Sequence, residues 1–348
     1  MSKPILGIIG GGQLGSMLAI AANKLEIKTV IFCNDIDAPA QNFSNDFVHG
    51  EYNDKNKINE FLSKVDVVTY EFENIPYETL NEINKIKPVL PKPSVNRIIQ
   101  HRLAEKDFIN NLNIRTTRYV SIEKKSEMDS VEDLLPGILK TTTLGYDGKG
   151  QHPINSLENL DSIDVDYSKG YILEKLVKLK KEISIIITRF DIQKYEIYEP
   201  IENEHEDQIL RNSKIPAEIS DKILEQSKLW ATTIAEELKY VGTLCVEFFI
   251  DRNDNLYVNE IAPRVHNSGH LTINAYNVSQ FENHVRAVCK LEQIPLKKIS
   301  NAMMTNIIGD QITNYRNKEH NENEFFFDYL KKEIKQKRKM GHLTTLLK

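Results

Sequence analysis

The sequence predicts an α/β domain followed by an α+β region, and three observations indicate this fold class. The length of 348 residues suits about two domains of ordinary size or three small ones. The N-terminal part alternates short apolar runs with amphipathic stretches, which is typical of parallel strands joined by helices. The rest of the chain has strand-like runs separated by loops and one long amphipathic helix, which is typical of an α+β domain.

The N-terminal elements are expected in the order strand, helix, strand, helix, strand. They occupy residues 5–9, 14–25, 29–33, 55–62 and 65–70. Because continuous apolar strands are buried on both faces, they indicate a parallel sheet with helices on each side. Residues 88–93 contain three prolines and precede helical patterns through residue 111, so we expect a domain boundary near residue 95.

The second region continues from those helical patterns into strands. Strand-like runs occupy residues 137–140, 171–174, 182–189 and 195–198. A helix is expected at residues 217–238, followed by hairpin strands at 243–250 and 256–261 that a polar turn joins. The tail at residues 314–339 is rich in Lys, Glu and Asn. We favour a solvated helix there, and the alternative is that its last basic residues reach an anionic ligand.

The composition excludes several classes of protein. The chain has 45 basic and 50 acidic side chains and a net charge of −5, so no excess charge favours nucleic acid or a membrane surface. No apolar stretch approaches the ~20 residues of a membrane span, and the N-terminal residues lack a signal-peptide pattern. Cys33, Cys245 and Cys289 lie far apart in apolar runs, which favours reduced thiols. We therefore expect a cytoplasmic protein.

A glycine-rich turn follows the first strand. Gly10, Gly12 and Gly15 match the pattern G-x-G-x-x-G, and Asp35 lies about 20 residues further on. Such glycines let the backbone turn tightly and present N–H groups to a phosphate at the start of a helix. The pattern fits an NAD-dependent dehydrogenase, but many βαβ folds use such a loop for other phosphates.

A second glycine-rich stretch follows the strand expected at residues 137–140. It contains Gly145, Gly148 and Gly150 together with Lys140 and Lys149. Backbone amides and ammonium groups in this composition suit a mobile lid over a triphosphate, although the stretch is not a Walker A sequence. The alternative is a polar surface hairpin.

Two glutamates lie on the expected hairpin strands. The turn places Glu247 opposite Glu260 and Ile250 opposite Tyr257, so both carboxylates share one face of the sheet. They would repel each other among apolar neighbours unless a cation lies between them, and Mg²⁺ with nucleotide phosphates suits such oxygen ligands. Asn259 offers a further oxygen. The alternative is a pair of exposed glutamates on an edge strand.

The residues after the hairpin are dense in hydrogen-bonding side chains. Arg264, His266, Asn267, Ser268 and His270 lie within seven residues of one another. This density suits the binding of a small oxyanion better than a packed core.

Taken together, these motifs resemble the N5-carboxyaminoimidazole ribonucleotide synthetase family, ATP-grasp ligases of bacterial purine biosynthesis. The resemblance covers nearly the whole chain and rests on residues 7–15, 69–76, 145–151, 259–270 and 338–342. It implies an ATP-grasp fold in three parts. These are a Rossmann-like PreATP-grasp domain at residues 1–95, a two-lobed ATP-grasp domain at 96–290 with a hinge near 174–177, and a small β-rich C-terminal domain at 291–348.

The resemblance implies an enzyme that carboxylates 5-aminoimidazole ribonucleotide to N5-carboxyaminoimidazole ribonucleotide with ATP and bicarbonate, through carboxyphosphate. Mg²⁺ or Mn²⁺ would accompany ATP, and NAD would not be used. A homodimer and a transient contact with the mutase that consumes the product are also implied. Three alternatives remain. Another ATP-grasp carboxylate–amine ligase would lack the loop at residues 264–270, an NAD-dependent dehydrogenase would leave the glutamate pair unexplained, and the third is a catalytically silent binding protein.

The resemblance also assigns site residues. Contacts to ATP are implied for Arg102, Lys140, Gly145, Tyr146, Asp147, Gly148, Lys149, Gly150, Gln151, Glu174, Lys175, Leu176, Val177, Glu182, His205, Asn259 and Glu260. Adenine would lie at residues 174–177 and the ribose at Glu182, and Glu247 and Glu260 would be the metal ligands. The ribonucleotide and bicarbonate would contact Gly12, Gln13, Leu14, Glu73, His266, Asn267, Ser268, His270, Arg338 and Lys339.

Three residues are expected to act on the reacting groups. Lys140 would neutralise charge on the phosphates while bicarbonate attacks the γ-phosphoryl group, Arg264 would hold the carboxyphosphate oxyanion, and His270 would orient the substrate or accept its proton. Two positions depart from the family pattern. His101 stands where Asp usually precedes the arginine of an Asp-Arg-Leu helix, and Leu144 stands where the family usually has a glycine. We interpret both as tolerated variation or altered nucleotide affinity.

Overall fold

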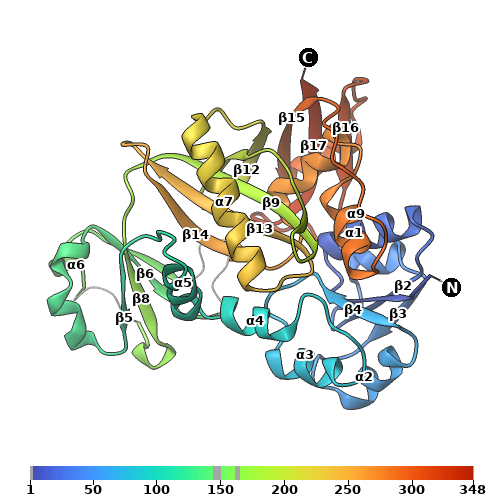
Figure 1. The fold of residues 1–348 in the computed structure, drawn as a ribbon, viewed down its shortest axis with the longest axis horizontal. Helices are drawn as coiled ribbons and strands as arrows, with labels where there is room; N and C mark the ends of the chain where they lie inside the picture. The colour runs from blue at the N-terminus through green and yellow to red at the C-terminus, as the bar shows by residue number, and fades with distance from the viewer. Residues whose placement is uncertain (1–2, 144–149, 161–164, 348) are drawn as a thin grey trace.

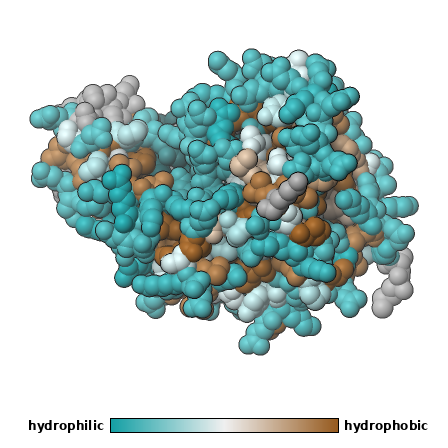
Figure 2. All heavy atoms as spheres, turned by 90° about the horizontal axis from the view of Figure 1, so that it is seen from above, coloured by the Kyte–Doolittle hydropathy of each residue, from teal (hydrophilic) through white to brown (hydrophobic). Residues whose placement is uncertain are grey.

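The computed structural model describes residues 3–143, 150–160 and 165–347, arranged as Figure 1 shows. Three sheets organise these residues: an N-terminal parallel sheet, a small antiparallel sheet and a large antiparallel sheet of nine strands. Hydrophilic side chains cover most of the face seen in Figure 2, and the apolar patches between them are small. No helix in the described part of the chain is long and apolar enough to cross a membrane.

The N-terminal sheet has the strand order β3-β2-β1-β4, with all strands parallel. Its strands are β1 (Leu6–Ile9), β2 (Thr29–Cys33), β3 (Asp46–His49) and β4 (Val67–Tyr70). Helices α1 (Gln13–Lys24) and α9 (Gln280–Val288) pack on one face, and α2 (Lys55–Leu62) and α3 (Tyr77–Asn84) pack on the other. Every residue of β1, β2 and β4 is buried. The predicted parallel sheet with two covered faces is therefore confirmed.

The sequence pattern did not predict β3, α3 or the short helix η1 (Pro39–Asn42). Strand β3 lies at the edge of the sheet, and Val48 is its one buried residue. An edge strand of this kind has no continuous apolar run, so hydrophobicity alone does not reveal it.

Two helices lead from this sheet into the second region, α4 (Pro93–Ile99) and α5 (Arg102–Asn111). The small sheet has the order β5-β8-β6-β7. Its strands are β5 (Tyr119–Ile122), β6 (Gly137–Thr141), β7 (Gln151–Ile154) and β8 (Tyr171–Lys175), and its short helices are η2 (Lys125–Ser130), η3 (Glu132–Leu134), α6 (Leu157–Leu160) and η4 (Tyr167–Lys169). The strands expected at residues 137–140 and 171–174 are confirmed as the two central strands of this sheet.

The large sheet has the order β14-β13-β9-β11-β12-β15-β17-β16, and β10 pairs with β9. Its first strands are β9 (Leu179–Asp191), β10 (Lys194–Ile197), β11 (Ile201–Glu206), β12 (Ile209–Ile215), β13 (Gly242–Asp251) and β14 (Leu256–Ala262). Helix α7 (Asp221–Glu237) packs against β9 and β13 through a buried apolar stripe. The predicted long helix and the predicted hairpin are confirmed.

The C-terminal elements extend the same sheet, because β12 pairs with β15. They are β15 (Asn301–Ile308), α10 (Gln311–Arg316), β16 (Glu324–Asp328) and β17 (Lys339–Leu347). The solvated helix favoured at residues 314–339 is wrong, because the helix ends at Arg316 and a strand follows. The three phenylalanines of β16 supply a strand that pairs with β17, so tertiary pairing overrides the polar composition of its neighbours.

Candidate active site

Glu247 and Glu260 lie directly opposite each other on β13 and β14, as predicted. The side chain of Glu247 is 14% exposed, and that of Glu260 is 44% exposed. Burial and the charge of Glu260 raise the pKa of Glu247 to about 8, as expected for two carboxylates in a partly buried place. Glu247 lies on the interior strand β13, so the alternative of two exposed edge-strand glutamates is wrong for this residue, whereas Glu260 does lie on the edge strand β14.

The predicted pairing of Ile250 with Tyr257 is also wrong, because Ile250 pairs with Leu256. The register shifts directly after Glu247, and Asn259 is the extra residue on the opposite strand. A β-bulge of this kind shifts every later pair by one residue. It also turns the segment around Asn259 at the point where the carboxylates meet.

Lys140 lies on β6 in a buried cluster of charges. Its Nζ is 3.2 Å from Oε1 of Glu174, and Nζ of Lys106 is 3.2 Å from Oε2 of the same carboxylate. Thr117 donates a further hydrogen bond of 2.8 Å to Glu174. Burial alone would raise the pKa of Glu174, but the two ammonium groups outweigh it and lower this pKa to about 2. The structure therefore brings the predicted Lys140 and Glu174 together as a buried ion pair.

Residues 176–178 connect β8 of the small sheet to β9 of the large sheet. Lys175 ends β8, where its Nζ donates to the backbone oxygen of Asp133 at 2.8 Å, and Leu176 is half exposed. This connection is where a hinge between two lobes was expected. Of the glycine-rich stretch, residues 144–149 lie outside the described residues, and Gly150 and Gln151 lead into β7 beside Lys140.

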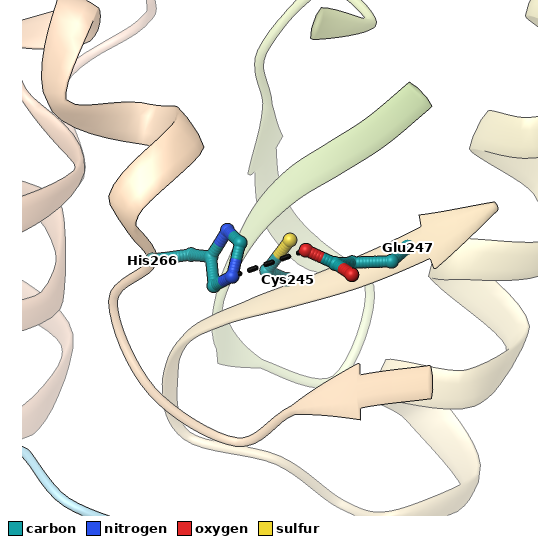
Figure 3. Close-up of side chains that lie close together, drawn as sticks. All are labelled: Cys245, Glu247 and His266. Carbon is teal, nitrogen blue, oxygen red and sulfur yellow. Dashed lines mark ion pairs between the residues drawn. The ribbon is translucent and has the colours of Figure 1, made fainter. Parts of the chain in front are cut away.

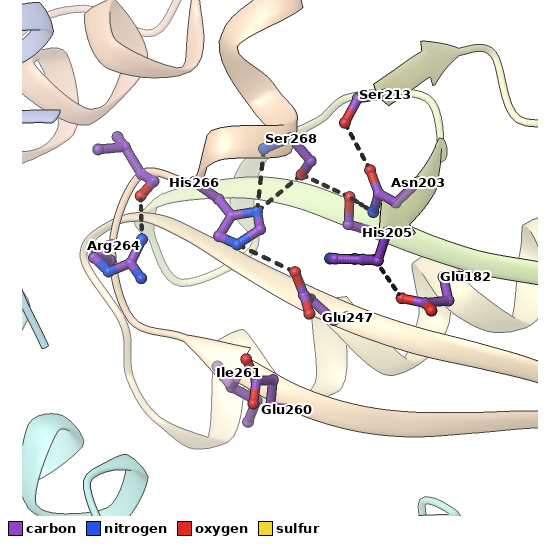
Figure 4. A network of polar contacts seen from close by, with 12 residues as sticks. Glu182, Asn203, His205, Ser213, Glu247, Glu260, Ile261, Arg264, His266 and Ser268 are labelled. Atoms are coloured by element: carbon purple, nitrogen blue, oxygen red, sulfur yellow. Dashed lines mark hydrogen bonds and ion pairs between the residues drawn. The ribbon is translucent and has the colours of Figure 1, made fainter. Parts of the chain in front are cut away.

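Glu182 and His205 lie side by side on β9 and β11, with Oε2 and Nδ1 separated by 2.8 Å. Burial lowers the pKa of His205, but the Glu182 carboxylate outweighs burial and leaves it raised. Ser184, two residues along β9, pairs with Glu247 on β13. The two residues predicted to hold the nucleotide thus lie beside the glutamate pair (Figure 4).

The loop after β14 turns back over the glutamate pair and ends in η5 (Asn267–Leu271) and α8 (Thr272–Ala275). Arg264 is partly buried and forms an ion pair with Glu73, which follows β4. His266 caps η5 and places its Nε2 3.1 Å from Oε1 of Glu247. The predicted oxyanion residues Arg264 and His266 therefore meet the predicted magnesium ligand and the predicted substrate contact.

A chain of buried polar groups fixes the ring of His266 (Figure 4). Asn203 donates to Ser184 at 3.0 Å, the hydroxyls of Ser184 and Ser268 are 2.8 Å apart, and Ser268 lies 2.9 Å from Nδ1 of His266. If each hydroxyl donates once along this series of hydrogen bonds, Nδ1 accepts a hydrogen bond from Ser268 and Nε2 carries the hydrogen that faces Glu247. Ser268 is fully buried, so it supports His266 and does not line the open pocket.

His270 has no exposed surface. Its ring packs against those of Phe281, Tyr329 and His342, with centroids 4.8 Å from His342. Neither ring nitrogen has a hydrogen-bond partner within the described part of the chain, and burial lowers its pKa well below the ordinary value. The amide of the neighbouring Asn267 is also buried without such a partner. Both lie behind His266 in this structure, and their predicted contacts with substrate stay predictions.

The glycine turn at residues 10–15 is filled by a carboxylate of the protein itself. Glu71 is buried, and its Oε1 accepts a hydrogen bond of 2.9 Å from the backbone N–H of Gly12. A Cβ atom at Gly10 would lie 2.7 Å from the same oxygen, so the carboxylate needs glycine there. Glu71 was not predicted, although it stands in the quoted 69–76 motif. Gln13 and Leu14 begin α1 directly beside it.

The basic tail returns to this part of the molecule. Lys332 forms an ion pair with Asp37 in the N-terminal domain, and Lys331 contributes to the electrostatic environment of Glu71. Lys331 also donates to the backbone oxygen of Lys339 at 2.7 Å, and Arg338 donates to that of Glu333 at 3.2 Å. The tail thus lies near the predicted substrate loop, and the alternative that its last basic residues reach an anionic ligand stays a prediction.

A pocket lies where the N-terminal domain, α5 and β14 meet. Its lining includes Glu73, Gln100, Arg102, Glu105, Glu260 and Arg264. Arg102 Nη1 is 3.4 Å from Glu260 Oε2, so this predicted ATP contact faces the predicted metal ligand. Glu105 was not predicted. It accepts a hydrogen bond of 2.6 Å from the N–H of Ile261, and burial and Glu260 raise its pKa to about 8. The sequence reveals neither Glu105 nor Lys106, because its pattern predicts that both are solvent-exposed positions on an amphipathic helix.

The site and the fold together define an ATP-grasp protein, and family models match the chain in three segments. An ATP-grasp domain matches residues 107–281, a ribonucleotide synthetase preATP-grasp domain matches residues 2–100, and a phosphoribosylaminoimidazole carboxylase C-terminal domain matches residues 302–348. The chain is 37% identical over 347 residues to the N5-carboxyaminoimidazole ribonucleotide synthase of Staphylococcus aureus strain MRSA252, covering 98% of this chain and 92% of the relative. The chain belongs to the N5-carboxyaminoimidazole ribonucleotide synthase family.

Solved structures agree with this assignment. The S. aureus N5-carboxyaminoimidazole synthetase complexed with ADP has a TM-score of 0.93 and 35% identity, over 99% of this chain and 93% of that chain. The Aspergillus clavatus enzyme in complex with ADP and 5-aminoimidazole ribonucleotide has a TM-score of 0.90 and 27% identity, over 99% and 94%. The ATP-grasp fold expected from the sequence is confirmed.

Proposed function

We propose that this protein uses ATP and bicarbonate to carboxylate 5-aminoimidazole ribonucleotide, giving N5-carboxyaminoimidazole ribonucleotide for purine biosynthesis. The observation that carries the proposal is the convergence of the Glu247–Glu260 pair with Arg264 and His266 beside one pocket. Two carboxylates alone would fit any ATP-grasp ligase. The added guanidinium and imidazole supply the donors that a bicarbonate or carboxyphosphate oxyanion needs.

The residues present fit Mg²⁺. Burial and the opposed Glu260 carboxylate raise the pKa of Glu247, a hard divalent cation would relieve the repulsion between the two groups, and Asn259 adds an amide oxygen next to them. When bound, the ion would neutralise part of the negative charge on the ATP phosphates. Mn²⁺ shares this ligand preference. Magnesium at Glu247 and Glu260 is therefore part of the proposal.

In the first step, an oxygen of bicarbonate attacks the γ-phosphorus of ATP, the new P–O bond gives carboxyphosphate, and the bond to ADP breaks. Lys140 has a fixed position because Glu174 holds it at 3.2 Å, and Arg102 faces Glu260 from the opposite wall. These cations lower the cost of charge that spreads over the phosphates in the transition state. Arg264 holds the carboxyphosphate oxyanion.

In the second step, the exocyclic amine of the ribonucleotide forms a C–N bond with the carboxyl carbon, either of carboxyphosphate or of the CO₂ that it releases. Phosphate leaves, and the amine loses a proton. The glycine turn at residues 12–14, Glu73 and the basic residues Arg338 and Lys339 are proposed to hold the ribonucleotide. Because carboxyphosphate is short-lived in water, the pocket must exclude solvent while it reacts.

The proposal is tested by magnesium-dependent release of ADP in bicarbonate buffer, with and without 5-aminoimidazole ribonucleotide. Strong stimulation by the ribonucleotide is expected. Release of ADP that ignores the ribonucleotide would instead favour another ATP-grasp carboxylate–amine ligase, and no release at all would contradict the proposal. A homodimer, a transient contact with the mutase and a cytoplasmic location stay predictions.

A further inference from the structure

We propose that Cys245, Glu247 and His266 form a binding site for a soft divalent cation such as Zn²⁺ (Figure 3). Their thiol sulfur, carboxylate oxygen and imidazole nitrogen all lie within 4.8 Å of one another. In the described part of the chain, no other three His, Cys, Asp or Glu side chains form such a group. The mixed set of sulfur, nitrogen and oxygen ligands suits Zn²⁺, whereas Mg²⁺ prefers oxygen ligands alone.

The backbone places the three groups without strain. Cys245 and Glu247 are two residues apart on β13, so their side chains leave the same face of the strand. His266 approaches from the loop after β14 and already has Nε2 3.1 Å from Oε1 of Glu247. Ligand distances of about 2.3 Å to sulfur and 2.0 Å to nitrogen would put these two atoms about 3.5 Å apart in a tetrahedral site. The sulfur and nitrogen atoms lie within 4.8 Å of each other in the structure. Side-chain rotation can bring them to the shorter distance, and the strands need not move.

Two buried hydroxyls provide support for a bound ion. Ser184 and Ser268 both lie within hydrogen-bonding reach of the Cys245 sulfur, and Ser268 is 2.9 Å from Nδ1 of His266. When the ion replaces the protons on sulfur and on Nε2, Nδ1–H donates to Ser268, and both hydroxyls rotate to donate to the thiolate. Asn203 continues to donate to Ser184. Every side-chain donor in this series then still has an acceptor, as supporting groups of metal sites require, and the backbone N–H of Ser268 gives up its 3.3 Å hydrogen bond to Nδ1.

The exposed fractions show how an ion would enter. Cys245 has no exposed surface, whereas the side chains of Glu247 and His266 are 14% and 13% exposed. The ion therefore reaches the carboxylate and imidazole first and the thiol last. Three protein ligands leave a fourth position for water. Because Glu247 is shared, a soft ion here excludes Mg²⁺ from the pair, and this inhibitory consequence rests on the proposed function, whereas binding itself does not.

The experiment uses Co²⁺ as a spectroscopic substitute for Zn²⁺, with purified metal-free protein and no nucleotide. We expect CoCl₂ to produce a sulfur-to-cobalt charge-transfer band at one ion per chain, and ZnCl₂ to displace it. Cys245→Ala should abolish the band and weaken Zn²⁺ binding by at least about tenfold. Cys289→Ala, which removes another buried thiol, should keep both. Cys245→Ser also removes the thiol but changes the side-chain volume less, so it should lose the band as well. Circular dichroism confirms that each variant is folded.

A band that is absent in the wild-type protein, or that persists in Cys245→Ala, would overturn the proposal. Cobalt binding of equal strength with and without the thiol would overturn it too, because the ion would then use the carboxylates alone. The titration contains neither ATP nor ribonucleotide, so a failure of the proposed carboxylation leaves its result unaffected. Inhibition by ZnCl₂, measured relative to each variant's own magnesium-supported rate, should decrease in Cys245→Ala and persist in Cys289→Ala.

Discussion

Arg264 forms a partly buried ion pair with Glu73, a residue 191 positions earlier in the chain. The contact joins the loop after β14 to the segment after β4, so it connects the proposed carboxyphosphate site to the N-terminal domain that is proposed to hold the ribonucleotide. The Glu73 carboxylate and burial together hold the guanidinium in one place, and a fixed cation needs no reorganisation when charge develops beside it.

Arg264→Ala is expected to lower kcat of the carboxylation by about 10²- to 10³-fold, the usual cost of removing one group that stabilises an oxyanion. The KM for ATP should change little, because the guanidinium faces Glu73 and not Lys140. Steady-state kinetics with varied ATP and ribonucleotide separate these effects. Arg286→Ala, which breaks a pair within α9, is the control. An unchanged carboxylation rate in Arg264→Ala would remove this residue from the mechanism.

Glu247→Gln and Glu260→Gln should each reduce the magnesium-dependent rate by about 10²-fold or more, because each removes a proposed ligand. The Glu247→Gln protein without magnesium should be no less stable than the wild type, because the variant removes a charge that is buried beside Glu260. Urea unfolding at pH 8 measures this. The exposed Glu204→Gln on β11 is the control. A loss of stability together with an unchanged rate would mean that the pair is structural.

Glu174→Gln should destabilise the protein by about 3 to 5 kcal/mol at pH 7, because Lys140 and Lys106 lose their buried partner. The pKa of Glu174 is lowered from 4.5 to about 2, so its stabilisation is complete above about pH 4.5 and is lost as the pH falls toward 2. The difference in unfolding free energy between wild type and variant should therefore shrink below about pH 4.5.

Urea unfolding at a series of pH values measures that difference. Glu218→Gln serves as the control, because it breaks the ion pair between Glu218 and Lys214. The Glu218 side chain is 72% exposed, and such surface pairs contribute little to stability. A difference for Glu174→Gln that stayed constant with pH would show that folding does not lower the pKa of this carboxyl, which would contradict the stabilising ion pairs.

His101→Asp tests the departure from the family pattern. His101 is the N-cap of α5, where its Nδ1 accepts a hydrogen bond of 3.4 Å from Ala104. Aspartate caps a helix better and complements the positive end of the helix dipole, so a gain of about 0.5 to 1 kcal/mol in stability is expected. Thermal unfolding measures the gain, and the KM for ATP should stay within about twofold. A large fall in KM would instead assign His101 to altered nucleotide affinity.

Sequence reasoning predicted the parallel sheet, the long helix α7 and the β13–β14 hairpin, because their apolar periodicity is local and strong. It paired Glu247 with Glu260 correctly, although the register it assumed at the turn was wrong by one residue, because the extra residue Asn259 offsets that error. It missed the bulge at Asn259, since no local pattern states where a ladder skips one residue. It also missed β16, since a strand among charged neighbours exists only through its pairing with β17.

The candidate site shows the same limit. The Gly-rich turn, Lys140 and the Arg264–His270 loop are visible as motifs, but their partners Glu71, Lys106 and Glu105 are not. Each of those partners is a charged residue buried by elements distant in the chain. A side chain of that kind looks solvent-exposed until the fold brings its counter-charge or hydrogen-bond donor beside it.

The most direct test of the central claim follows the carboxyl carbon. Purified protein is incubated with ATP, Mg²⁺, 5-aminoimidazole ribonucleotide and labelled bicarbonate, and the products are separated and identified at once. The account predicts label in N5-carboxyaminoimidazole ribonucleotide, with one ADP released for each labelled product, and loss of both in Glu260→Gln. Release of ADP without label in the ribonucleotide would contradict it.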